Sequence, residues 1–198
     1  MSTKPTMHST NNVGVHVDDK DGCIVMLNDG SHVIVRPIHA DDRDLEANFI
    51  KRLSSEARHF RFLGAMREAS ATLLDQLVNV DYRSSMAFVA LIYDQTSPRE
   101  VGVSRYSASL GGNDCECAVT IADEWQHRGL AVVLMQRLID EARQKGFQKM
   151  FSMDSIANEP MRELAQYLGF RNTPDPEDVS QVIYTLDLQS TSGGESKS

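Results

Sequence analysis

The stretch VTIADEWQHRGLAVVLMQRLIDEARQKG, residues Val119–Gly146, joins a strand-like run to a long amphipathic pattern. Apolar residues after the run recur at helical intervals as far as Lys145. Between the two parts lies QHRGLA, a short basic turn around Gly129, at the point where a helix must begin. The first N–H groups of a helix have no partner inside it and point outward, which favours an anion. The stretch therefore predicts a strand, an anion-binding turn and a helix from about Gly129 to Lys145.

Length and composition fit one globular domain with a core of its own. The chain has 198 residues, of which 41% are hydrophobic and 24% are charged. Both ends are polar and lack periodicity, so we expect an unstructured lead-in over residues 1–20, a single domain over 21–188 and a flexible tail over 189–198. The N-terminus lacks the apolar region of a signal peptide, and no apolar run reaches the length of a membrane span. We expect no contact with a membrane.

Charge and cysteine content narrow the class of protein further. The net charge of −8 argues against a nucleic-acid-binding protein and is compatible with basic or amine-bearing partners. The three cysteines, Cys23, Cys115 and Cys117, are too few for a disulfide framework. Cys115 and Cys117 have no second Cys or His pair at ligand spacing, so no metal site is expected. These features indicate a protein of the reducing cytoplasm.

The front of the chain alternates β-rich runs with helical patterns. Asp29-Gly30 lies between two β-rich runs, which is typical of a hairpin. Asp41 is then the expected N-cap of a helix in which Leu45, Phe49 and Leu53 recur every fourth residue. Two shorter helices with serine caps are expected in SSEARHFRFL and SATLLDQLVN.

The remaining elements complete a mixed pattern. Strands are expected in SMAFVALIYD, REVGVSRYSASL and CECAVTIA, followed by the helix from Gly129. A strand in KMFSMDSI, a helix in NEPMRELAQYLG that stops at Gly169, and a last strand in QVIYTLDL follow. The order ββ-ααα-βββ-α-β-α-β predicts an α+β or mixed α/β domain with a largely antiparallel sheet at its front.

The turn itself resembles a known signature. The chain has neither G-x-x-x-x-G-K-[ST] nor G-x-G-x-x-G, so it is neither a P-loop nor a Rossmann protein. Its turn is similar to the [QR]-x-x-G-x-[GA] motif of the GNAT N-acetyltransferase superfamily, with Ala131 in place of the more frequent second glycine. Successive N–H groups at a helix N-terminus suit a diphosphate, and a glycine lets the backbone approach it closely. The motif residues are Gln126, His127, Arg128, Gly129, Leu130 and Ala131.

The resemblance extends over roughly residues 33–188. It implies the acyl-CoA N-acyltransferase fold, a twisted, mostly antiparallel central sheet flanked by helices, with acetyl-CoA as co-substrate. The turn, with Val132, would hold the diphosphate, and the edge of the preceding strand would pair with the peptide-like pantetheine arm. That strand contributes Val119, Thr120 and Ile121. Asn158 opens NEPMRELAQYLGF, which resembles the second conserved block of the family and would flank the same arm.

A closer resemblance is to the acetyltransferase domain of bacterial protein lysine acetyltransferases. It rests on VIVRPIHADD, ARHFRFLG, NVDYRSSMAFVAL, VGVSRY and CECAVTIADEWQHRGLA. The larger domains to which that domain is often fused have no room in 198 residues. The resemblance implies an amine acceptor, above all a protein lysine side chain.

Glu116 is the candidate general base. Alternation places Cys115, Cys117 and Val119 on one apolar face of the strand and Glu116 on the other, beside small residues. A charge on a central strand needs a cleft or a partner. The related acetyltransferases carry their catalytic glutamate at the matching position, whereas the structural alternative is an ion pair with Arg105.

The sequence leaves the general acid, the acceptor and the oligomeric state open. Many GNAT enzymes have a tyrosine general acid where this chain has Ala165, and Tyr167 lies about 200° further round the helix, so no acid is assigned. A small-molecule amine is a rival acceptor. A non-catalytic acyl-CoA sensor or interaction module on the same fold is a rival of another class. The oligomeric state is also open, with a homodimer among the alternatives.

Overall fold

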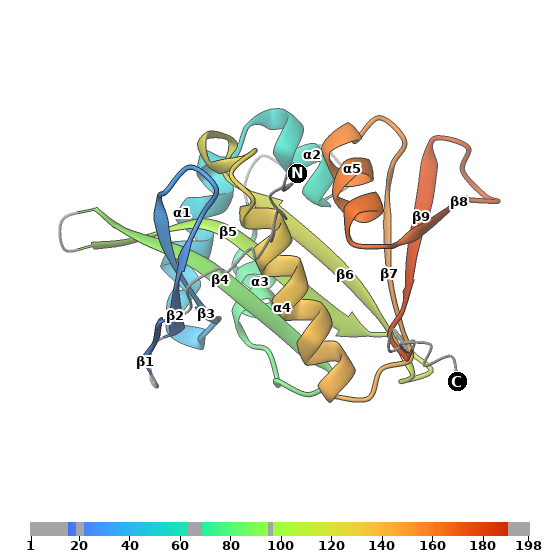
Figure 1. Ribbon diagram of the computed structural model, residues 1–198, viewed down its shortest axis with the longest axis horizontal. Coiled ribbons are helices and arrows are strands. Elements are labelled where there is room, and N and C mark those ends of the chain that lie inside the picture. Colours follow the sequence, from blue (N-terminus) through green and yellow to red (C-terminus); the bar gives the residue numbers. More distant parts are fainter. Residues whose placement is uncertain (1–15, 19–21, 63–68, 95–96, 190–198) are drawn as a thin grey trace, which may run out of the picture.

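A computed structural model describes residues 16–18, 22–62, 69–94 and 97–189 of the chain, and these contain one sheet of nine strands. The strands lie in the order β1-β2-β3-β4-β5-β6-β7-β9-β8. Every neighbouring pair is antiparallel except β6 and β7, which are parallel. The prediction of a mostly antiparallel sheet flanked by helices is confirmed (Figure 1). The strands are β1 His16–Asp18, β2 Gly22–Met26, β3 His32–Pro37, β4 Ser85–Asp94, β5 Ser97–Ala108, β6 Asp114–Ile121, β7 Lys149–Ser155, β8 Arg171–Pro174 and β9 Gln181–Asp187.

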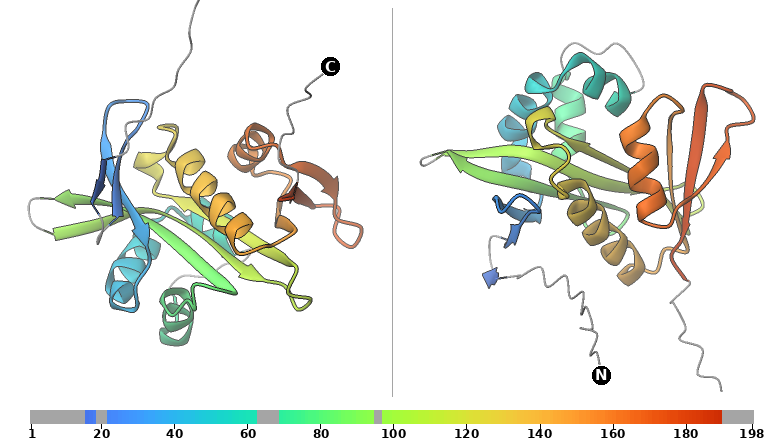
Figure 2. Two further views of the ribbon diagram at one scale, coloured as in Figure 1. Left: turned by 60° about the horizontal axis from the view of Figure 1, so that its bottom comes forward. Right: turned by 45° about the horizontal axis from the view of Figure 1, so that its top comes forward.

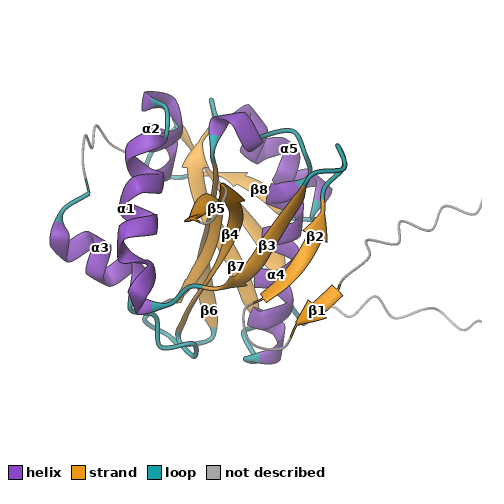
Figure 3. Ribbon diagram, turned by 90° about the vertical axis from the view of Figure 1, so that its left-hand side faces the viewer, coloured by secondary structure: helices purple, strands orange, loops and turns teal. Residues whose placement is uncertain are grey.

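In the described part of the chain, α-helices lie on both faces of the sheet (Figure 2). Figure 3 shows the first three helices on one face, and α4 and α5 on the other. They are α1 Arg43–Arg52, α2 Ser55–Phe62, α3 Ala71–Val78, α4 Leu130–Gln144 and α5 Glu159–Tyr167. Short 3-10 helices span Ala40–Asp42 and Asp123–Trp125. The side chain of Ser70 accepts a hydrogen bond from the Leu73 N–H, which confirms one predicted serine cap.

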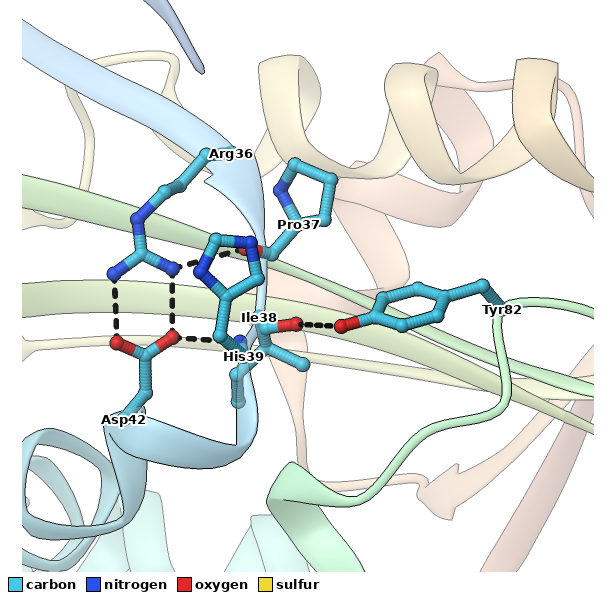
Figure 4. A network of polar contacts seen from close by, with 6 residues as sticks. All are labelled: Arg36, Pro37, Ile38, His39, Asp42 and Tyr82. Carbon is cyan, nitrogen blue, oxygen red and sulfur yellow. Dashed lines mark hydrogen bonds and ion pairs between the residues drawn. The ribbon is translucent and has the colours of Figure 1, made fainter. Parts of the chain in front are cut away.

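The start of α1 differs from the prediction. The N-cap was expected at Asp41, but α1 begins at Arg43, and the preceding Asp42 binds the end of β3. Asp42 forms two bonds of 2.6 Å with the Arg36 guanidinium and accepts a third from the His39 N–H at 2.7 Å (Figure 4). A bidentate pair with arginine is stronger than an exposed cap, so Asp42 determines where the chain turns.

Two strands lie where none was expected. β8 pairs with β9 in a segment between Gly169 and Gln181 for which the sequence predicted no strand. β1 pairs with β2 inside the segment taken as an unstructured lead-in, of which residues 1–15 and 19–20 lie outside the described residues. Both strands are short and lack apolar alternation, so only their pairing with a neighbouring strand identifies them.

Helix α4 packs closely against the middle of β5. The Ser104 hydroxyl donates a 3.0 Å hydrogen bond to the Leu134 carbonyl oxygen. A Cβ on Gly102 would lie 2.9 Å from Ile121 Cδ1 and 3.1 Å from Leu134 Cδ1, so a larger residue would force these side chains to shift. Leu134 is fully buried. This packing holds the first turn of α4 at the end of β6.

The parallel pair β6–β7 separates soon after it begins. Its register runs only from Asp114 opposite Lys149 to Glu116 opposite Phe151. Beyond Glu116 the two strands diverge towards the start of α4 on one side and α5 on the other (Figure 1). In the described part of the chain, residues 117–121 therefore have no strand partner on the β7 side.

Candidate functional site

The turn between β6 and α4 presents a row of unpaired backbone N–H groups. His127 and Gly129 both have left-handed backbone angles, with φ of 59° and 87°. Helix α4 has no side-chain cap. Its first backbone hydrogen bond is donated by the Val133 N–H to the Gly129 carbonyl oxygen at 3.2 Å. Among the described residues, nothing accepts a hydrogen bond from the N–H groups of residues 128–132. Such a set of free donors at a helix start fits a diphosphate.

Two features favour glycine at position 129. Its φ of 87° is unfavourable for residues with a side chain. A Cβ there would also lie 2.8 Å from Asn28 Nδ2, in the turn of the β2–β3 hairpin. The predicted motif residues therefore lie together in one turn, but Arg128 points back to Asp29 and Trp125 within the protein.

The unpaired side of β6 carries the strand residues predicted for the cofactor arm. Val119 and Ile121 are half-buried and Thr120 is buried. Within the described chain, the Thr120 hydroxyl has no hydrogen-bond partner. An open strand edge beside the turn can pair with the two amides of a pantetheine arm as it would with another strand.

Asn158 caps helix α5 on the other side of the divergence. Its Oδ1 accepts a 3.2 Å hydrogen bond from the Met161 N–H, and its Nδ2 donates to Asp154 Oδ1 at 3.1 Å. Burial raises the pKa of Asp154, although the bonds from Asn158 and the Ser155 N–H oppose the change. Both side-chain polar atoms of Asn158 therefore form hydrogen bonds within the chain. The sequence did not indicate that Asp154 would accept one of them.

Glu116 lies on the face of β6 opposite its two cysteines, as alternation predicts. Cys115 and Cys117 are buried thiols, and burial raises the pKa of Cys115 to about 12. Glu116 is exposed and lines a cavity of about 280 Å³ between α3, β4, β5 and β6. Leu77, Val80 and Met86 give this cavity apolar walls.

Arg105 lines the same cavity but does not pair with Glu116. Its Nη2 lies 3.0 Å from Glu46 Oε1 on α1, and its Nη1 donates to the Leu77 carbonyl oxygen at 3.0 Å. In the described part of the chain, the Glu116 carboxylate has no hydrogen bond or ion pair. The structural alternative of an ion pair between Glu116 and Arg105 is therefore wrong, and Glu116 is left with a carboxylate available to a ligand.

Sequence reasoning missed the buried carboxyl groups beside Arg105. Glu46 is 1% exposed, and Glu100 on β5 is fully buried. Burial, and then the nearby charge of Glu46, raise the pKa of Glu100 well above its usual value. A signal existed for Glu46, because it lies three, four and seven residues before the buried Phe49, Ile50 and Leu53.

Three further observations concern metal ligands, membrane-spanning helices and the predicted position of a general acid. In the part of the chain that the structure describes, no group of three or more His, Cys, Asp or Glu side chains is placed to hold a metal ion. No described helix is long and apolar enough to cross a membrane. Tyr167 is 73% exposed, whereas Ala165 is buried.

Comparison with known proteins identifies the family. The sequence model of the Acetyltransferase (GNAT) family matches residues 55–170, which is more than half of the chain, so the protein belongs to this family. It is an acetyl-CoA-dependent acyltransferase. The chain is 54% identical over 168 residues to Acetyltransferase PA5475 of Pseudomonas aeruginosa, covering 85% of this chain and 90% of the relative.

More distant relatives agree with the resemblance to bacterial protein acetyltransferases. The chain is 28% identical over 152 residues to Acetyltransferase Pat of Mycolicibacterium smegmatis, covering 73% of this chain but 43% of that protein. The crystal structure of the GNAT domain of S. lividans PAT superposes with a TM-score of 0.76 at 24% identity, covering 83% of this chain and 95% of that one. At this identity the match shows the fold.

Proposed function

We propose that the protein transfers the acetyl group of acetyl-CoA to a primary amine, with Glu116 as general base and a protein lysine side chain as acceptor. The observation that carries the proposal is the unpaired Glu116 carboxylate, which lines a cavity one residue before the open edge of β6. If the pantetheine arm of acetyl-CoA pairs with residues 119–121, its thioester would lie beside this carboxylate. We place the reaction in the cytoplasm, in keeping with three buried thiols.

The cofactor is held in this proposal by three parts of the site. The free N–H groups of residues 128–132 bind the diphosphate, because they are donors without acceptors at a helix start. Gln126 and His127 complete the turn, and Val119–Ile121 pair with the pantetheine arm. Asn158 acts by capping α5, which borders the arm.

The chemistry needs a neutral amine. A lysine amine with a pKa of about 10.4 costs about 4.6 kcal/mol to deprotonate at pH 7. The amine nitrogen attacks the thioester carbonyl carbon, and its proton passes to the Glu116 carboxylate. The C–S bond then breaks with its electron pair on sulfur. The thiolate takes a proton from water, and Glu116 returns its own proton to the solvent, which regenerates the base. General-base catalysis of this kind contributes about 10²–10⁴-fold.

The lining of the cavity favours a linear alkyl amine. Leu77, Val80 and Met86 offer apolar contacts for methylene groups, and Glu116 lines the same cavity and can meet the amine. A lysine side chain has this pattern, as has a small polyamine. A non-catalytic sensor would need no free carboxylate at this position, which is why we place it second.

The test compares Glu116→Gln with the wild type. Release of free thiol from acetyl-CoA is measured over a panel of small amines and lysine-bearing proteins, and acetyl-CoA affinity is measured by calorimetry. We expect turnover to fall by about 10²–10⁴-fold with little change in affinity. Glu141→Gln, which removes a half-buried carboxylate that pairs with Lys145 on α4, is the control. A wild type that binds acetyl-CoA but releases no thiol with any acceptor would establish the sensor instead.

A further inference from the structure

The turn of the β2–β3 hairpin touches the anion-binding turn, although about 100 residues separate them in sequence (Figure 1). The Asn28 N–H donates a 3.1 Å hydrogen bond to the Arg128 carbonyl oxygen. The hairpin turn, residues 27–31, lies outside residues 55–170, which the family model matches. The contact therefore joins a segment outside the matched residues to a turn within them.

Arg128 is held from three sides. Its Nη1 lies 2.8 Å from Asp29 Oδ2, its Nη2 donates to the Glu124 carbonyl oxygen at 2.7 Å, and its guanidinium carbon lies 4.6 Å from the Trp125 ring centre. Hydrogen bonds from the Ser31 hydroxyl and N–H lower the pKa of Asp29, so Asp29 is ionised at neutral pH. The positive charge of Arg128 is thus paired within the protein.

Asn28 packs against Gly129. A Cβ on Gly129 would lie 2.8 Å from Asn28 Nδ2 and 3.2 Å from Asn28 Cγ. The Asn28 carboxamide therefore occupies the side of Gly129 on which any other residue would carry its side chain. The hairpin turn fixes the carbonyl and side chain of Arg128 and packs beside the Cα of Gly129.

We propose that Asp29 and Asn28 are positioning residues for cofactor binding, which hold the turn of residues 126–132 in the shape that a diphosphate requires. This inference rests on the proposed function. Two left-handed residues, His127 and Gly129, make the turn costly to order in isolation. A binding site ordered in advance spares the ligand that cost. Arg128 then serves as the anchor of the turn, and the backbone N–H groups bind the anion.

The first test uses Asp29→Asn, which keeps the side-chain size and removes the charge. Two donors are compared by kcat/KM: acetyl-CoA, and S-acetylpantetheine, which lacks the diphosphate and nucleotide. We expect kcat/KM with acetyl-CoA to fall about threefold to tenfold, with no change for S-acetylpantetheine or in the KM for the amine. Asp140→Asn removes the same charge from an exposed pair on α4 and should change none of these values.

The second test is a double-mutant cycle between Asp29→Asn and Arg128→Gln, read as the calorimetric Kd for acetyl-CoA. If Arg128 acts only as an anchor, Arg128→Gln weakens binding at least as much as Asp29→Asn, and the double variant loses no more than Arg128→Gln alone. An additive loss, or tighter binding by Asp29→Asn, would mean that Arg128 contacts the diphosphate itself and would overturn the inference. A wild type that does not bind acetyl-CoA refutes the proposed function as well, whereas unchanged binding in Asp29→Asn refutes only the positioning role.

Discussion

Arg105 on β5 forms its ion pair with Glu46 on α1, 3.0 Å away, and not with Glu116 on the adjacent strand. Arg105 stands opposite Ala118 in the β5–β6 register, so it lies on the same face as Glu116, two positions along β6. The partner it takes, Glu46, is almost fully buried. The Arg105–Glu46 ion pair neutralises the buried charge of Glu46 and leaves the Glu116 carboxylate free at the cavity wall.

Replacing Arg105 should destabilise the fold strongly. Arg105→Met leaves Glu46 buried without its partner, which costs about 3–5 kcal/mol of unfolding free energy. Arg43→Met is the control, because its ion pair with Asp75 is exposed and should contribute less than about 1 kcal/mol. Urea denaturation measures both. Equal losses for the two variants would show that the buried pair has no special weight.

Gly129→Ala should weaken acetyl-CoA binding by more than its backbone strain explains. The variant places a Cβ 2.8 Å from Asn28 Nδ2 as well as forcing a side chain into left-handed backbone. Gly146→Ala, at the other end of α4, has the similar φ of 84° with nothing within 4 Å. We expect a similar loss of stability of about 1–2 kcal/mol from φ in both variants. Only Gly129→Ala should raise the calorimetric Kd, by about tenfold or more.

Asp42 should make stability fall in acid. Burial by itself raises the pKa of Asp42, but the hydrogen bonds from Arg36 and the His39 N–H outweigh it, and the pKa lies below its usual value. A lowered pKa contributes stability above the unfolded pKa of about 3.9, and this is lost as pH falls through the folded pKa. Asp42→Asn should therefore be less stable than wild type at pH 7, by a margin that narrows below about pH 4. Denaturation over this pH range checks it, and a constant margin would contradict it.

Glu100 should change the pH dependence of stability in the direction opposite to Asp42. Burial and the neighbouring Glu46 raise its pKa, so the folded state retains a proton that the unfolded chain releases. Stability from this group is present below the unfolded pKa of about 4.3 and declines, by at most about 1.4 kcal/mol per pH unit, until the folded pKa is reached. Glu100→Gln removes this decline, so its stability relative to wild type should rise with pH. Urea denaturation from pH 5 to 9 measures the difference, and parallel curves would refute the assignment.

Much of the site could be predicted because its signals are local. The period of two in CECAVTI separates Glu116 from the buried Cys115 and Cys117 without reference to any other segment. Gly129 before an amphipathic run predicts both the turn and the helix, which begins at Leu130. Asp41 was the wrong cap because the Arg36–Asp42 pair, formed across six residues, outweighs a local preference.

The sequence by itself determined the order of the main elements, the glycine turn before α4 and the face of β6 that bears Glu116, because backbone periodicity and glycine conformation depend on neighbouring residues. The tertiary structure decided which side chains meet. It paired Arg105 with Glu46, brought Asp29 to Arg128 across 99 residues, and opened β6 from β7 after Glu116. These contacts depend on how helices and strands pack, and several partners are equally compatible with each charge until packing selects one.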